Sequence, residues 1–214
     1  LMEPSNAAVE AGCQGTMRVD VRTTGVRSHS ARSWMGENAI HRAGEILRRL
    51  EAYEPRQVEI DGLVYREGLN AVGIRGGVAG NVVPDEVRLL LNHRFAPDRT
   101  PVEAEAHVRA VLAPFLEDGD RVEVEDVASA AYPALEHPLI AAMIERDGLA
   151  VGAKLGWTDV ARFSELGVPA INLGPGDATL AHAADERVAR DSLERVHRSI
   201  GGLLRHGVGD GTER

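Results

Sequence analysis

Between residues 16 and 128, strand-like and helix-like apolar patterns follow one another in an order that few folds accommodate. An alternation of apolar and polar residues predicts a first, half-buried strand through Met17, Val19 and Val21. Apolar residues at spacings of three and four then predict a helix over 37–53. Two further strands are predicted at 69–75 and 86–95, and the glycines between them indicate antiparallel neighbours.

A strong helix start follows at Thr100. Threonine can cap the helix, Pro101 suits the first helical position, and Glu103 can reach back to the cap. This helix is expected to run to about Leu116, and a turn leads into a last strand over 121–127. The resulting βαββαβ order is that of a ferredoxin-like sandwich, which we expect to span residues 16–128.

The flanking segments, 1–15 and 129–214, have a different pattern. Helices are predicted at 137–148, 158–166 and 190–204, with one buried strand at 168–173. One strand is too little sheet for an independent α/β domain, because sheets average about five or six strands. We therefore expect an α+β sandwich inserted into an incomplete α/β domain. Leu1 is not an initiator residue, so the chain is also expected to start within a longer protein.

Composition excludes several classes of protein. A net charge of −9 and 4% aromatic residues give neither the basic surface nor the stacking platform of a nucleic-acid binder. The sequence contains no apolar run of the ~18 residues that a membrane span needs. The single cysteine, Cys13, fits a reducing compartment. These features predict a cytoplasmic protein with no membrane or nucleic-acid partner.

Two residues have the chemistry of metal ligands. Glu3 follows a short apolar segment and precedes a rigid proline, so its carboxylate could bind a divalent metal. His182 follows a buried strand and a glycine turn, with Asp185 and Glu186 close enough to orient its second ring nitrogen. A solvated acid and an ordinary loop histidine remain the alternatives.

Five further residues could contact a substrate. His29 follows the first sandwich strand and could donate a hydrogen bond to an oxyanion, and Asn81 follows a glycine run and could bind a carbonyl. Arg94, inside an apolar strand, and Arg162, four residues after Thr158 on one predicted helical face, could hold a carboxylate. The alternatives are a surface histidine, a turn asparagine and structural salt bridges.

Several ordered motifs resemble those of the M20 family of dinuclear-zinc amidohydrolases, and especially its succinyl-diaminopimelate desuccinylase branch. The resemblance extends from Glu3 to the last helix. It depends on Met-Glu-Pro-Ser (2–5), Ala-Gly-Cys-Gln-Gly-Thr (11–16), His-Ser-Ala-Arg (29–32), Gly-Glu-Asn-Ala (36–39), Gly-Gly-Val-Ala-Gly-Asn-Val-Val-Pro (76–84), Lys-Leu-Gly-Trp-Thr-Asp-Val-Ala-Arg-Phe (154–163) and Gly-Pro-Gly-Asp-Ala-Thr-Leu-Ala-His (174–182).

The resemblance implies a metal-dependent hydrolase that converts N-succinyl-LL-2,6-diaminopimelate and water to succinate and diaminopimelate, in lysine biosynthesis. Two divalent ions, zinc or alternatively cobalt, would be bound, with Glu3 as a ligand of one and His182 as a ligand of the other. The 16–128 sandwich would be a lid and dimerisation domain of a homodimer.

The resemblance also implies roles for the remaining candidate residues. His29 would sit in the partner subunit's active site and stabilise the tetrahedral oxyanion. The residues implied to grip substrate carboxylates and carbonyls, or to line the pocket, are Asn81, Arg94, Thr158, Arg162 and Arg32.

The sequence departs from the family pattern at its start. The His-x-Asp element, the bridging aspartate and the Glu-Glu pair of the family would precede Glu3. We therefore expect these 214 residues alone neither to assemble the dinuclear site nor to turn over substrate. Two other interpretations remain: another M20 N-acyl-amino-acid deacylase, such as an acetylornithine deacetylase, or a non-catalytic ferredoxin-like dimerisation module.

Overall fold

The computed structural model describes residues 1–181 and 183–207. They form two compact units. Unit 1 comprises Leu1–Gln14, Val58–Tyr65 and the chain from Ala130 onward, and unit 2 comprises Gly15–Gln57 and Arg66–Ser129.

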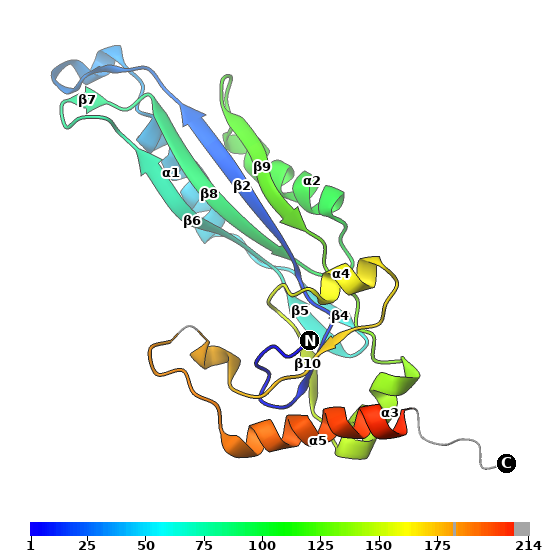
Figure 1. Ribbon diagram of the computed structural model, residues 1–214. Helices are drawn as coiled ribbons and strands as arrows, with labels where there is room; N and C mark the ends of the chain where they lie inside the picture. Colours follow the sequence, from blue (N-terminus) through cyan, green and yellow to red (C-terminus); the bar gives the residue numbers. More distant parts are fainter. Residues whose placement is uncertain (182, 208–214) are drawn as a thin grey trace. The chain divides into compact units, whose positions relative to one another are not determined.

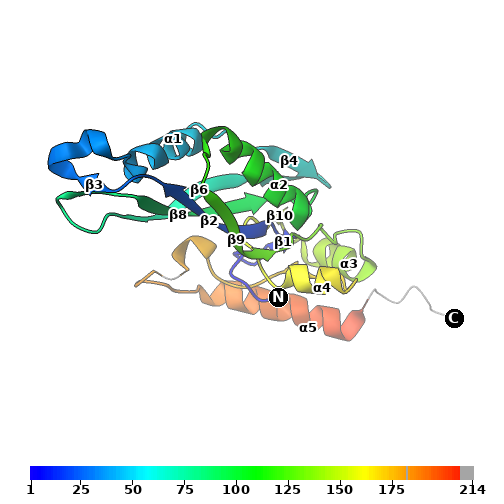
Figure 2. The same ribbon diagram turned by 90° about the horizontal axis from the view of Figure 1, so that it is seen from above.

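Unit 2 is built on a four-stranded antiparallel sheet in the order β6-β8-β2-β9. Two helices cover one face of this sheet and leave the other face free of helices (Figures 1 and 2). In chain order the elements are β2 (Gly15–Thr24), α1 (Ala39–Glu51), β6 (Gly68–Gly76), β8 (Glu86–Phe95), α2 (Pro101–Leu112) and β9 (Arg121–Ala128). This is the βαββαβ order of a ferredoxin-like sandwich, so the predicted fold class is confirmed.

The core of unit 2 lies between the sheet and the two helices. Along β8, Val87, Leu89 and Leu91 are fully buried, whereas the residues between them point to the open face. Helix α1 buries Ala43 and Ile46. Each fully buried large apolar side chain contributes about 1.5–3 kcal/mol.

Helix α2 begins where the sequence predicts. The Thr100 hydroxyl accepts a hydrogen bond from the Glu103 N–H at 3.3 Å, and the Glu103 carboxylate accepts one from the Thr100 N–H at 2.8 Å. The helix ends at Leu112 rather than near Leu116 and continues as the short 3₁₀ helix η2 (Ala113–Phe115). Pro114 explains the early end, because its ring has no N–H to continue the α-helical hydrogen bonds.

A small two-stranded element with a short 3₁₀ helix, the tip, precedes α1. Strand β3 (Ser28–His29) pairs with β7 (Val82–Val83) and leads into the 3₁₀ helix η1 (Ser30–Met35). Asn38 then caps α1 by accepting a hydrogen bond from the Ile40 N–H at 2.9 Å.

A hairpin that the sequence analysis did not predict interrupts the 16–128 range. Strands β4 (Gln57–Ile60) and β5 (Leu63–Arg66) flank Asp61 and Gly62, whose φ values are 51° and 73°. Two consecutive positive φ values are typical of a type I′ turn, for which Asp-Gly is a preferred pair. Most of this hairpin, Val58–Tyr65, belongs to unit 1.

Unit 1 contains more sheet than predicted. Strand β1 (Val9–Ala11) pairs in parallel with β10 (Val151–Ala153) and antiparallel with β11 (Ile171–Asn172), so three strands replace the single one expected. The predicted strand over 168–173 is reduced to β11. The remaining elements are α3 (Pro138–Asp147), α4 (Val160–Glu165), the 3₁₀ helix η3 (Ala178–Leu180) and α5 (Arg190–His206).

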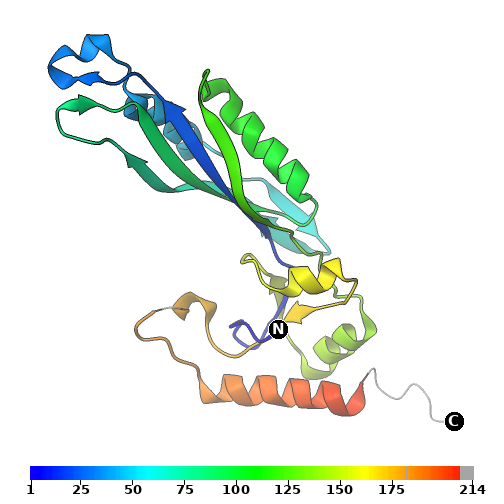
Figure 3. The same ribbon diagram turned by 45° about the horizontal axis from the view of Figure 1, so that its top comes forward.

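The core of unit 1 includes Val9, Ala11, Met143 and Val196. Helices α3 and α5 pack together (Figure 3), and the Arg146 guanidinium donates a hydrogen bond to the Ser199 carbonyl at 3.0 Å. Within the described residues, no helix has the length and apolar character needed to cross a membrane.

Candidate active-site residues

His29 lies on the tip of unit 2 with one ring nitrogen already engaged. Its Nδ1 accepts a hydrogen bond from the Ala31 N–H at 3.0 Å and thereby caps η1. A nitrogen that accepts from a backbone N–H carries no proton in the neutral ring, so the proton is on Nε2. The side chain is exposed, so the Nε2–H of His29 can donate a hydrogen bond to a ligand outside the tip.

Two other predicted residues share this tip. The Asn81 carbonyl accepts a hydrogen bond from the Ser30 N–H at 2.9 Å, which places Asn81 beside the residue that follows His29. Arg32 lies at a kink in η1, with φ −133° and ψ 46°. Both side chains are exposed. The structure thus brings His29, Arg32 and Asn81 together.

Arg94 projects from β8 without an acidic partner. Its Nε donates to the Asn92 amide oxygen at 3.1 Å, and within the described part of the chain it forms no salt bridge. Burial lowers the pKa of Arg94 below its usual value, because partial desolvation disfavours the charged form. A partly desolvated guanidinium without a counter-ion is suited to bind a ligand carboxylate.

The tip, whose strands β3 and β7 form a separate two-stranded sheet, adjoins one end of the four-stranded sheet, and Arg94 lies near the other end. Strand β7 of the tip precedes β8 by two residues, whereas Arg94 lies eight positions after Glu86, the first residue of β8. Eight residues of extended strand span roughly 26 Å. One copy of unit 2 therefore does not place His29 and Arg94 around the same small molecule.

In unit 1, the segment that carries Glu3 is bound to the glycine turn that follows β11. The Asn6 N–H donates to the Gly176 carbonyl at 2.7 Å and the Ala7 N–H to the Gly174 carbonyl at 3.0 Å. A Cβ on Gly174 would lie 2.2 Å from the Glu3 carbonyl oxygen, so only glycine fits there. The two segments predicted to supply metal ligands are therefore adjacent at Glu3 and Gly174.

The backbone beside Glu3 is strained. Asn6 and Ala7 have φ values of 54° and 55°, a left-handed conformation that side chains with a Cβ disfavour. Such residues persist where surrounding contacts hold them, and they cluster at functional sites. The hydrogen bonds to the glycine turn supply those contacts here and fix the backbone from which Glu3 projects.

A complete metal site is not formed by the described residues. Glu3 is exposed and offers carboxylate oxygens, and His182 lies outside the described residues. Within residues 1–181 and 183–207, no group of three or more His, Cys, Asp or Glu side chains could hold a metal ion. The donors described here do not by themselves fit a dinuclear centre, so we derive no catalytic step through one.

Thr158 and Arg162 have different surroundings, contrary to the prediction that they share a helical face. Helix α4 begins at Val160, so Thr158 lies before it. Thr158 is buried, and its hydroxyl has no hydrogen-bond partner within the described residues. Arg162 is exposed, pairs with Asp159 at 3.1 Å and stacks over Trp157 at 5.5 Å.

A polar cluster on the unit 1 sheet was not predicted from the sequence. The Lys154 ammonium lies 2.5 Å from the Glu10 carboxylate, and the Asn172 amide donates to the Glu10 carbonyl at 3.2 Å. Asn172 is fully buried, and its amide oxygen has no partner within the described residues. Asn172 is polar within an otherwise apolar strand, and this was the signal available in the sequence.

The sequence is similar to proteins named as desuccinylases. It is 48% identical over 197 residues to the succinyl-diaminopimelate desuccinylase of Corynebacterium glutamicum, covering 92% of this chain and 53% of that protein. It is 50% identical over 208 residues to a Mycobacterium tuberculosis protein with the provisional name succinyl-diaminopimelate desuccinylase DapE, covering 94% of this chain and 57% of that protein. The chain thus spans somewhat more than half the length of these relatives.

Solved structures share the fold at low sequence identity. A tripeptidase from Staphylococcus aureus superposes with a TM-score of 0.71 at 20% identity, covering 92% of this chain and 53% of that one. The M20 family metallo-carboxypeptidase Sso-CP2 from Sulfolobus solfataricus gives a TM-score of 0.73 at 16% identity, covering 95% and 62%.

The profile of one family matches residues 12–120, which is about half of the chain and includes most of unit 2. Its description is peptidase dimerisation domain, of the M20 type. The resemblance found in the sequence motifs is thereby confirmed, and the chain belongs to the M20 family through its peptidase dimerisation domain.

Proposed function

We propose that this chain is part of a metal-dependent hydrolase that cleaves N-succinyl-LL-2,6-diaminopimelate to succinate and diaminopimelate. The observation that carries the proposal is the 48–50% identity to proteins named as desuccinylases over more than 90% of the chain. The reaction belongs to lysine and diaminopimelate biosynthesis, and we place it in the cytoplasm.

We assign Glu3 and His182 as metal ligands in this proposal, with zinc or cobalt as the metal. A bound divalent ion polarises a carbonyl and lowers the pKa of an attacking water. Support for Glu3 comes from its backbone, which hydrogen bonds and a close glycine contact hold beside the turn that leads toward residue 182.

We assign His29 the role of stabilising the oxyanion that forms when water attacks the amide. Its Nε2–H has no hydrogen-bond partner within the described residues, and its ring is oriented by the Ala31 N–H. Hydrogen bonds aimed at charge that develops in the transition state are often the largest single catalytic contribution. Because the tip with His29 adjoins one end of the four-stranded sheet and Arg94 lies near the other end, we propose that His29 acts on substrate bound by a second copy of the chain.

We assign the other predicted residues to substrate binding, with different strength of support. Arg94 has the best support, since its guanidinium is half-buried and lacks an acidic partner within the described residues. Asn81 and Arg32 share the tip with His29 and would contact the same substrate. The buried Thr158 hydroxyl has no hydrogen-bond partner within the described residues, whereas the guanidinium of Arg162 is already paired with Asp159.

Succinate release tests the proposal. We would measure succinate release by the 214-residue chain and by the full product of the reading frame that encodes this chain, each with and without a chelator. The 214 residues alone should release none, whereas chelation should abolish release by the product of the reading frame, and zinc or cobalt should restore it. Release of succinate that is indifferent to the chelator, or preference for N-acetylornithine, would contradict the assigned reaction.

His29→Ala, made in the product of the reading frame that encodes the chain, tests the catalytic role of the tip. Loss of an oxyanion donor should lower kcat by about 10²–10³-fold with little change in KM, because the interaction is made in the transition state. His41→Ala is the matched control, since His41 is an exposed histidine of α1 in the same unit. Equal kcat values for the two variants would remove His29 from the mechanism.

A further inference from the structure

The open face of the unit 2 sheet carries a row of four arginines, one from each strand. Arg75 of β6 pairs in register with Arg88 of β8, Arg88 with Arg22 of β2, and Arg22 with Arg121 of β9. Residues directly opposite each other in antiparallel strands point to the same face. The row therefore crosses the whole sheet on the face that α1 and α2 leave uncovered (Figure 1).

Acidic side chains neutralise only the middle of this row. The Asp20 carboxylate accepts from the Nε of Arg88 at 2.8 Å and from the Nε of Arg22 at 3.4 Å. Glu125 lies 3.7 Å from Arg88. Within the described residues, neither Arg75 nor Arg121 forms an ion pair or a side-chain hydrogen bond.

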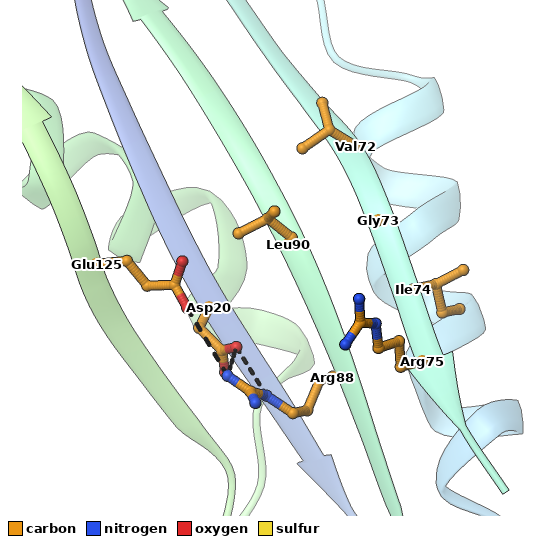
Figure 4. A pocket seen from close by; sticks show the side chains of 8 residues that line it. All are labelled: Asp20, Val72, Gly73, Ile74, Arg75, Arg88, Leu90 and Glu125. Carbon is orange, nitrogen blue, oxygen red and sulfur yellow. Dashed lines mark hydrogen bonds and ion pairs between the residues drawn. The ribbon is translucent and has the colours of Figure 1, made fainter.

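The arrangement leaves Arg75 opposite another cation. Like charges directly opposite each other destabilise a sheet, and although Asp20 and Glu125 offset the charge of Arg88, Arg75 itself has no ion pair within the described residues. Arg88 is turned toward Asp20 and Glu125, whereas Arg75 projects over β8 with no dashed line to any residue drawn (Figure 4). An anion bound at Arg75 would supply the missing counter-charge.

A cavity of ≈ 360 Å³ lies beside Arg75. Its volume falls within the range of small-molecule sites, about 300–1,000 Å³. Val72 and Leu90, from neighbouring strands, form an apolar part of its wall, and the Arg88 guanidinium with its two acids forms the opposite side (Figure 4). The lining thus combines an apolar surface, an ion-paired cluster around Arg88, and one cation, Arg75, that has no ion pair within the described residues.

We propose that this cavity binds a small organic carboxylate, with the carboxylate on Arg75 and an apolar portion against Val72 and Leu90. Asp20 and Glu125 are both engaged with Arg88, so among the charged side chains that line the cavity Arg75 alone has no ion pair within the described residues, and its guanidinium can take one carboxylate. The guanidinium fork fits carboxylate geometry. This site is separate from the hydrolase proposal, because it depends on residues that the proposed reaction does not use.

Binding of 4-methylpentanoate to the chain, followed by calorimetry and by chemical shifts of the arginine Nε–H groups, tests the site. A Kd on the order of 1 mM is expected for so small a ligand. Arg75→Gln should weaken binding by about tenfold or more, since a charged hydrogen bond is lost. Arg75→Lys keeps the positive charge but loses the paired N–H donors of the guanidinium. It should therefore weaken binding less than Arg75→Gln does.

Arg121→Gln is the matched control. Arg121 belongs to the same row and is likewise exposed and unpaired within the described residues, but it does not line the cavity. Its variant should bind the carboxylate as the unchanged chain does. Equal weakening by both substitutions would indicate general charge attraction and overturn the site. Binding of the neutral amide 4-methylpentanamide with equal affinity, or no saturable binding, would overturn it as well.

Discussion

At the scale of single residues, two neighbouring imidazoles make unit 2 sensitive to acid. His93 is fully buried, its ring centroid lies 5.5 Å from that of His107, and the His107 Nε2 lies 2.8 Å from the Tyr53 hydroxyl. Burial, followed by the positive charge of Arg99 and by His93, lowers the pKa of His107 to about 4. Burial also lowers the pKa of His93, so both rings are neutral at pH 7.

The sign of the pH dependence follows from these shifts. A histidine in the unfolded chain has a pKa of about 6.5, so the unfolded state binds more protons between about pH 6.5 and pH 4. The free energy of unfolding should therefore fall as pH drops through this window. His107→Gln should make the decline shallower in urea titrations, whereas the exposed His41→Gln should keep the original slope. Equal slopes for both variants would contradict the role of His107.

This pair could not be predicted from the sequence, because His93 and His107 are on β8 and α2 and meet only through packing. The arginine row has the same origin: its members are ordinary strand residues until the register places them side by side. His29 was identified from its loop, but which ring nitrogen carries the proton depends on the Ala31 N–H.

At the scale of elements, the Thr100 cap should contribute measurably to stability. Thr100→Ala removes the hydroxyl that accepts from the Glu103 N–H and should lower the free energy of unfolding by about 1 kcal/mol. Glu105→Gln is the comparison, because it breaks only an exposed pair with Arg109 that is worth about 0.3–0.5 kcal/mol. Urea unfolding measures both, and a Thr100→Ala loss no greater than that of Glu105→Gln would contradict the cap.

Local chemistry explains which elements the sequence predicted. The start of α2 was predicted correctly because its signals are contiguous, and β8 because its alternation runs for ten residues. The hairpin at Asp61-Gly62 was missed although the turn pair is present, since the flanking strands have only four residues each. Strands β1 and β10 have three residues each, too few to show a period, and they are stabilised by pairing across the chain.

At the scale of the whole molecule, the two edges of the unit 2 sheet are unlike. The edge strand β9 carries Glu123, Glu125 and Asp126 and shifts its register beside Arg18, features that discourage pairing with another chain. The other edge strand, β6, contains neither lysine nor proline, carries Arg75 as its one charged residue and exposes Ile74 at 53%; α1, which packs against β6, exposes Ile40 at 41%. We therefore expect the dimerisation domain to associate through the β6 and α1 edge.

Ile74→Asp tests this expectation. A carboxylate in place of this exposed apolar side chain should shift the chain from a dimer, twice the 23.0 kDa of one copy, toward the monomer in sedimentation experiments. Val102→Asp is the control, because Val102 is 77% exposed on α2, away from β6, and its variant should remain dimeric. Retention of the dimer by Ile74→Asp would exclude this edge. Equal dissociation of the two variants would attribute the effect to added negative charge on a chain that already carries −9, and so would remove the specific role of β6.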